Sequence, residues 1–134
     1  MCLLINKNQK PQIATKPIVC YKCLTKDMLS PCYNQKYELS KMLTSEFSIE
    51  IGNNCDKVEK GLHTFVNELE AKYVAKEFSW WNQITGDYYP EHASIVVKCI
   101  IPKGASYYKA ESMTTGVSYE YASNQLIPLE IISK

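Results

Sequence analysis

The C-terminal third of the chain constrains the fold most. Two apolar, β-branched runs lie at residues 93–101 and 126–132, and a polar, tyrosine-rich stretch separates them. The first run is almost continuously apolar, which is typical of a strand buried on both faces near the centre of a sheet. The second run contains Pro128, whose missing backbone N–H predicts an edge or bulged strand. The chain therefore builds a β core, and we expect the tyrosine-rich stretch to be an excursion from it.

Shorter strands precede this core. Runs that are β-branched, aromatic or alternately apolar and polar predict strands at 2–5, 18–24, 47–51, 61–66 and 117–122. Residues 6–17, with two prolines, read as a loop or arm, and Pro102 to Gly104 make a turn. Residues 37–43 fit either a strand or a single helical turn.

One helix is predicted at about 67–79. Asn67 is a suitable N-cap residue, and Glu70 follows at the spacing of a capping box. Leu69, Tyr73 and Val74 then recur at helical intervals and predict the apolar face. The expected fold class is α+β, a mostly antiparallel, twisted sheet with one main helix and long loops. We expect residues 1–17 to form an N-terminal strand and arm, and residues 18–134 to form a single domain.

Composition limits the possible partners. The 134 residues include 15 basic and 14 acidic side chains, for a formal net charge of +1. This balance gives no reason to expect non-specific binding to nucleic acid or to an anionic membrane. All the basic residues are lysines, and the chain has no arginine, the usual bidentate ligand for phosphate. An anion site here must use lysines, backbone amides or hydroxyls.

The cysteines do not predict a metal site or a redox centre. The N-terminal apolar run is too short for a signal peptide, so we expect a cytoplasmic protein whose six cysteines are reduced thiols. Cys20 and Cys23 match a C-x-x-C pattern, but within a strand they face opposite sides of the sheet. No second paired motif and no catalytic signature accompany them. We expect no metal and no cofactor.

Aromatic pairs near lysines are the strongest candidates for a binding site. Aromatic side chains with a polar end are preferred at interfaces and stack on nucleobases. The alternative is that these aromatic residues are structural, with about half of them in the core and the rest covering the open face of the sheet. If they form a site, lysines neutralise phosphate, and His63 and Ser123 supply hydrogen bonds. The candidate ligand- or partner-binding residues are Lys22, His63, Trp80, Trp81, Lys103, Tyr107, Tyr108, Tyr121 and Ser123.

Residues 18–132 resemble a group of small proteins and N-terminal domains common in tailed phages and prophages. The residues that carry the resemblance are Tyr21-Lys-Cys-Leu24, Ser30-Pro31, Tyr37-Glu-Leu39, Gly61-Leu-His-Thr-Phe65, Ala71, Tyr73, Lys98-Cys-Ile-Ile-Pro-Lys-Gly104, Tyr107-Tyr108 and Tyr121-Ala-Ser123. Ser40 and Ala110 stand where that group usually has glycine. The resemblance implies a phage or mobile-element origin, and hence the cytoplasm of an infected or lysogenic bacterial host, but no established activity.

The order of elements is also similar to that of ADP-ribosyltransferase folds. Gly61-Leu-His-Thr-Phe65 and Tyr73 occupy comparable places, and Glu120 or Glu130 could stand for the catalytic glutamate. The missing arginine and the missing paired-glutamate motif depart from that family.

Together these features predict a non-enzymatic phage-type binding protein that acts in counter-defence. It would sequester a small nucleotide signal or dock on a host immune protein. Two alternatives stay open: an ADP-ribosyltransferase-like enzyme acting on a dinucleotide, and a structural or accessory phage protein. Homo-oligomerisation would suit the latter, because a sheet with a free edge and exposed aromatics favours self-association.

Overall fold

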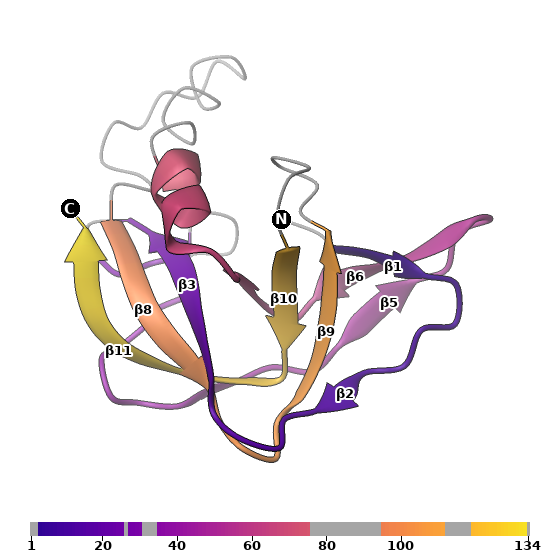
Figure 1. Cartoon of the computed structure of the whole chain (residues 1–134), viewed down its shortest axis with the longest axis horizontal. Coiled ribbons are helices and arrows are strands. Elements are labelled where there is room, and N and C mark those ends of the chain that lie inside the picture. Colours follow the sequence, from indigo (N-terminus) through magenta and orange to yellow (C-terminus); the bar gives the residue numbers. More distant parts are fainter. Residues whose placement is uncertain (1–2, 26, 31–34, 76–94, 112–118, 134) are drawn as a thin grey trace.

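The computed structural model describes residues 3–25, 27–30, 35–75, 95–111 and 119–133. Within these residues the fold is mostly an antiparallel β structure with a single helix, at residues 68–75 (Figure 1). The coarse prediction of an antiparallel sheet with one helix is therefore confirmed. No helix in the described part of the chain is long and apolar enough to cross a membrane.

The strands form two sheets. A large eight-stranded sheet has the order β2-β9-β10-β7-β3-β8-β11-β4, and a small sheet has the order β1-β6-β5. All pairings within both sheets are antiparallel. The strands are β1 (Leu3–Asn6), β2 (Gln12–Ile13), β3 (Ile18–Leu24), β4 (Leu43–Thr44), β5 (Ser48–Glu50), β6 (Cys55–Lys60), β7 (Leu62–Phe65), β8 (Ile95–Ile101), β9 (Ser106–Glu111), β10 (Tyr119–Ser123) and β11 (Gln125–Ser133).

β3 lies at the centre of the large sheet, between β7 and β8. The apolar run at 93–101 predicts an interior strand, and its residues 95–101 form β8, which lies between β3 and β11. β11 follows β8, and its register shifts between Pro128 and Glu130. The predicted irregularity at Pro128 is thus confirmed, since the bulge lets the strand continue past a residue that cannot donate.

The two faces of the large sheet bury different clusters. Side chains alternate along a strand, so residues opposite one another in the register share a face. The core face carries the largest cluster, including Cys20, Leu62, Val97 and Tyr121. The other face, here called the helix face, has the helix packed on Phe65 and Val96. The small sheet packs on the same face farther along, against Tyr108 and Ala122.

Several local predictions need correction. Tyr107 and Tyr108 belong to β9, a full strand between β2 and β10, and are not an excursion from the sheet. The arm contributes β2, and β6 was missed because four of the six residues of Cys55–Lys60 are charged. The ambiguous segment 37–43 contains Tyr37, which is buried in the core, and reaches only the two-residue strand β4.

The helix begins as predicted but buries a different face. The Asn67 side chain accepts hydrogen bonds from the backbone N–H groups of Leu69 (2.8 Å) and Glu70 (3.2 Å), which is the geometry of an N-cap. Leu69 and Tyr73, however, are exposed, and the buried face is formed by Ala71, Val74 and Ala75. The small residues let the helix lie close to the sheet. Residues 76–79 of the predicted helix lie outside the described residues.

Candidate functional site

The predicted site residues do not gather at one place. Lys22, Tyr107, Tyr121 and Ser123 lie on the core face, because Tyr121 is opposite Thr64 and Ser123 is opposite Tyr107 in the strand registers. His63 and Tyr108 are opposite Ala122 on the helix face. A site that uses both sets would have to pass through the sheet.

The remaining predicted residues lie elsewhere. Lys103 is exposed in the turn between β8 and β9, where Ala105 N–H donates to the Pro102 carbonyl (3.1 Å) and Gly104 has a φ of 91° that favours glycine. Trp80 and Trp81 fall outside the described residues.

Tyrosines and one lysine do form a cluster at the β2 end of the core face. Tyr107 and Tyr121 meet edge to face, with ring centroids 5.6 Å apart. The Lys109 ammonium lies 5.1 Å from the Tyr119 centroid and 6.0 Å from that of Tyr121, within the range of a cation–π contact. The Tyr107 hydroxyl donates to Gln12 Oε1 at 2.7 Å. The structure thus brings together two predicted residues and adds Lys109 and Tyr119 to them.

Lys22 is a structural cation. Its side chain is 9% exposed, and its ammonium donates to the His63 carbonyl at 2.8 Å and lies 5.8 Å from the Tyr37 centroid. The hydrogen bond links β3 to β7 across the centre of the sheet. A lysine held in this way is not available to neutralise a phosphate.

His63 is buried in its neutral form. Burial, and then the Lys22 charge, lower the pKa of its imidazole to about 3, because both disfavour the charged ring. Neither ring nitrogen has a hydrogen-bond partner among the described residues. The backbone of Glu59 raises the pKa of the imidazole, but this effect is smaller than those of burial and of Lys22. His63 is therefore neither an acid near neutral pH nor an exposed ligand contact.

The two candidate acids differ in burial. Glu120, on β10, is 1% exposed and lies on the helix face. It is opposite Phe65, two residues along the strand pairing from His63. Glu130 is exposed on β11, opposite Lys98. Of the two, only Glu120 shares a face and a neighbouring strand with His63.

The buried cysteines are protected thiols. Burial raises the pKa of both Cys20 and Cys23 to about 12, and it also raises that of Cys99. Cys20 lies beside Thr64, whose hydroxyl lowers the thiol pKa slightly without meeting the geometry of a hydrogen bond, and Cys23 donates to the Ala71 carbonyl at 3.0 Å. Since the thiolate is the reactive form, these groups are poor nucleophiles. The described residues contain no cluster of side chains suited to a metal ion.

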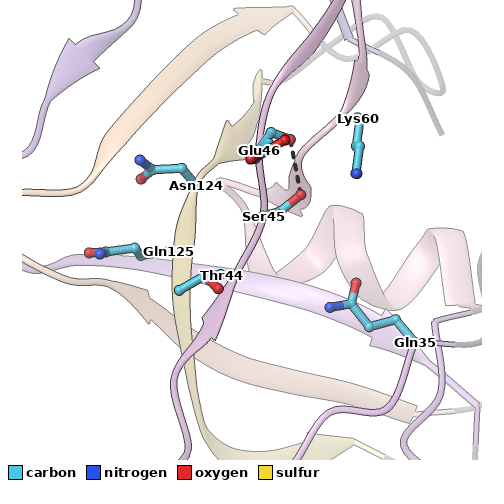
Figure 2. Close-up of a pocket in the computed structure, with 7 residues that line it drawn as sticks. All are labelled: Gln35, Thr44, Ser45, Glu46, Lys60, Asn124 and Gln125. Carbon is cyan, nitrogen blue, oxygen red and sulfur yellow. Dashed lines mark hydrogen bonds between the residues drawn. The ribbon is translucent and has the colours of Figure 1, made fainter.

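The described residues also form a polar recess. It has a volume of about 560 Å³ and is open on one side. In Figure 2, Lys60 and Gln35 lie on one side of the segment that carries Thr44 to Glu46, while Asn124 and Gln125 lie on the other. The lining consists of carboxamides, hydroxyls and two charges: Gln35, Thr44, Ser45, Glu46, Lys60, Asn124 and Gln125.

Backbone pairing fixes the position of this recess. β4 pairs with the start of β11, placing Thr44 opposite Gln125, and Ser45 N–H donates to the Asn124 carbonyl at 2.9 Å. The Asn124 side chain accepts from Ser106 N–H at 2.9 Å, which orients its amide nitrogen away from that bond. Lys60 stands at the end of β6. The recess therefore forms where the large sheet, the small sheet and the segment between them meet.

The two charges of the recess are available to a ligand. Among the described residues, Lys60 and Glu46 form no ion pair with each other or with any other group. None of the seven described residues predicted from the sequence lines the recess. Its lining residues come from four separate segments and carry no motif, so the sequence offered no signal for them beyond polarity.

No family model, no curated protein and no solved structure matches this chain in the three comparisons made.

Proposed function

We propose that this chain is a non-enzymatic binding protein that sequesters a small nucleotide-class ligand in the polar recess. The recess itself carries the proposal. Its volume of about 560 Å³ is that of a small-molecule site, and its lining is polar throughout. An apolar ligand would gain little there, whereas a ligand rich in hydrogen-bonding groups could satisfy many partners.

The lining chemistry favours a nucleotide over other polar ligands. A lysine ammonium binds phosphate as a point charge, which is the mode left to a chain without arginine. A carboxylate such as that of Glu46 accepts hydrogen bonds from a ribose diol. Carboxamides pair with the donor and acceptor edges of a base, as Asn and Gln do with adenine. Lys60, Glu46 and the amides of Asn124 and Gln125 supply all three kinds of contact.

The phage resemblance supports a role for this binding in counter-defence. A protein that removes a nucleotide signal needs affinity and no turnover, and the described residues offer protected thiols and a neutral, buried histidine at their centre. The ligand would be a signal made by the host, and the site of action its cytoplasm.

Calorimetric titration with a nucleoside monophosphate, a nucleoside diphosphate and a cyclic dinucleotide tests the proposal. We expect binding of at least one, and about a tenfold loss of affinity in Lys60→Gln, which corresponds to about 1.4 kcal/mol. Glu46→Gln should weaken ligands with a free ribose diol and spare those without one. Lys41→Gln is the matched control, since Lys41 is an exposed lysine paired with Glu38 outside the recess.

Two results would end the proposal. One is the absence of binding for all three probes together with a native mass spectrum free of any retained nucleotide-sized mass. The other is equal affinity in the wild type and Lys60→Gln.

The second candidate is an ADP-ribosyltransferase-like enzyme acting on a dinucleotide. The observation that favours it is Glu120 and His63 on one face of the adjacent strands β10 and β7. Such an enzyme would break the bond between nicotinamide and ribose in NAD, form a new bond from the ribose to water or to an acceptor nucleophile, and release nicotinamide. Glu120→Gln would abolish this release while leaving the protein folded. Unchanged NAD after prolonged incubation with the wild type would exclude this candidate.

A further inference from the structure

The free edge of the large sheet has a chemistry of its own. β2 is the last strand of the sheet and pairs with β9, with Gln12 opposite Tyr107 and Ile13 opposite Ser106. The pairing extends beyond the strand, since Ala14 N–H donates to the Ala105 carbonyl and Gly104 N–H donates to that of Ala14.

This register sets two pairs of lysines at the two ends of the edge. Lys16 and Lys103 flank the Ala14 and Gly104 pairing at one end. Lys10 and Lys109 lie at the other, where Gln9 Nε2 donates to the Lys109 carbonyl at 3.5 Å. Residues 105–109 are extended, and at 3.2–3.4 Å per residue the two pairs therefore stand at least roughly 13 Å apart. We call this surface the basic edge: Lys10, Lys16, Lys103 and Lys109 around Tyr107 and Tyr119.

The four lysines of the basic edge are exposed, and none forms an ion pair with a described residue. Four lysines elsewhere are paired with acids: Lys7 with Asp56, Lys41 with Glu38, Lys57 with Glu50 and Lys72 with Glu68. The sequence explains the difference, because residues 1–26 and 92–110 contain no Asp or Glu. Glu111, at the end of β9, is the nearest acid along these strands.

Between the lysine pairs lies an aromatic centre. Tyr119 is 46% exposed and offers its ring to a partner. Tyr107 is already held by Gln12 and by the Tyr121 ring. A partner that contacts such pre-ordered side chains loses little side-chain entropy on binding.

These features favour a protein over a nucleic acid as the occupant. The Lys109 ammonium lies over the Tyr119 ring and competes with a stacked base for its face. The chain also lacks arginine, and its net charge is only +1. A separation of at least roughly 13 Å between the lysine pairs is too large for one small anion and suits an extended partner surface. Tyrosine anchors within a charged rim are the usual anatomy of a protein interface.

We propose that the basic edge is the docking surface for a partner protein that presents acidic side chains around an apolar contact. This surface is separate from the polar recess, since the two share no residue. The proposal does not depend on a nucleotide ligand, and the two can fail independently.

The test uses a 14-residue peptide of alternating Glu and Val, labelled with a fluorophore, and measures its anisotropy with the full chain. We expect binding that weakens as salt is raised, because exposed charges are screened. The double variant Lys10→Glu/Lys109→Glu should lose at least tenfold in affinity, and Tyr119→Ser a smaller but measurable factor. The matched control is Lys41→Glu/Lys72→Glu, which changes the net charge equally and lies away from the edge. Melting curves of all variants verify that they are folded.

Four outcomes would overturn the proposal. The first is no peptide binding by the wild type at low salt, and the second is an equal loss in the edge and control double variants. A third is tighter binding of a 14-nucleotide thymidine oligomer with the same dependence on the edge lysines, which would make the occupant a nucleic acid. The last is self-association of the wild type in sedimentation that Lys10→Glu/Lys109→Glu abolishes, which would make the occupant a second copy of the chain.

Discussion

Lys22 and Lys109 lie on the same face of the large sheet, one on its central strand and one near its edge. Lys22 is 9% exposed, and its ammonium donates a hydrogen bond to the His63 carbonyl. Lys109 is exposed and makes cation–π contacts with tyrosine rings. Tyr121 and Tyr119, two positions apart on β10, show a similar gradient, with 7% and 46% exposure. Lysine and tyrosine are residue types that often bind ligands, but in this sheet the side chains near the centre are buried and only those near the edge are accessible to a ligand.

The largest expected effect comes from removing the central lysine. Lys22→Ala should lower the free energy of unfolding by about 2–4 kcal/mol, because the His63 carbonyl loses its donor and the buried stem leaves a cavity. Lys109→Ala should change it by less than about 0.5 kcal/mol. Denaturant titration measures both, and Lys22→Met, which keeps the volume, should recover part of the loss. Equal effects of Lys22→Ala and Lys109→Ala would contradict the comparison.

The second prediction concerns pH. The pKa of His63 is lowered to about 3 in the folded state against an ordinary 6.5, so its contribution is complete above pH 6.5 and falls as pH decreases toward 3. Between pH 6.5 and 5 the loss should be about 2 kcal/mol, at about 1.4 kcal/mol per pH step. This window lies above the range in which Asp56, Glu38 and Glu50 titrate, since their pKa values are lowered.

Denaturant titrations of the wild type and His63→Phe at pH 6.5 and 5 measure this contribution. The variant should show a flatter dependence on pH, even if its overall stability differs. A wild-type stability that stays constant across this window would mean that His63 is protonated as easily in the folded chain as in the unfolded one.

The smallest expected effect lies at the edge. Tyr107→Phe removes the hydrogen bond to Gln12, which is exposed to solvent, and should cost less than about 1 kcal/mol of folding free energy. Thermal unfolding of the variant checks this. A loss as large as that of Lys22→Ala would show that the edge is as tightly ordered as the centre and would remove the distinction drawn above.

The sequence predicted the parts of the fold in which pattern and environment agree. The apolar run at 95–101 is buried between two strands, and Asn67 caps the helix as its side chain suggests. β6 was missed because four of its six residues are charged: Lys57 pairs with Glu50 and Glu59 on the open surface of the small sheet. The helix was placed on the wrong face because the sheet accepts Ala71 and Ala75 more closely than the larger Leu69 and Tyr73.

The site was harder to predict than the fold. Lys22 and His63 have the chemistry of ligand contacts, but tertiary packing buries both, and sequence carries no direct record of depth in a sheet. The recess depends on where β4, β6 and the β10–β11 turn meet, which joins residues from Gln35 to Gln125. The position of this recess follows from the strand order, and no local sequence pattern predicts it.

The strand order also affects how the chain can fold while it is being synthesised. β3, which the chain makes early, lies between β7 and β8, and its long register is with β8 at residues 95–101. Among the described strands, β4 pairs with β11, which is synthesised much later. During synthesis the apolar β3 therefore has no β8 to pair with until residues 95–101 have been made, and pairings so distant in sequence form slowly. We expect the nascent chain to depend on chaperones until residues 95–133 have emerged.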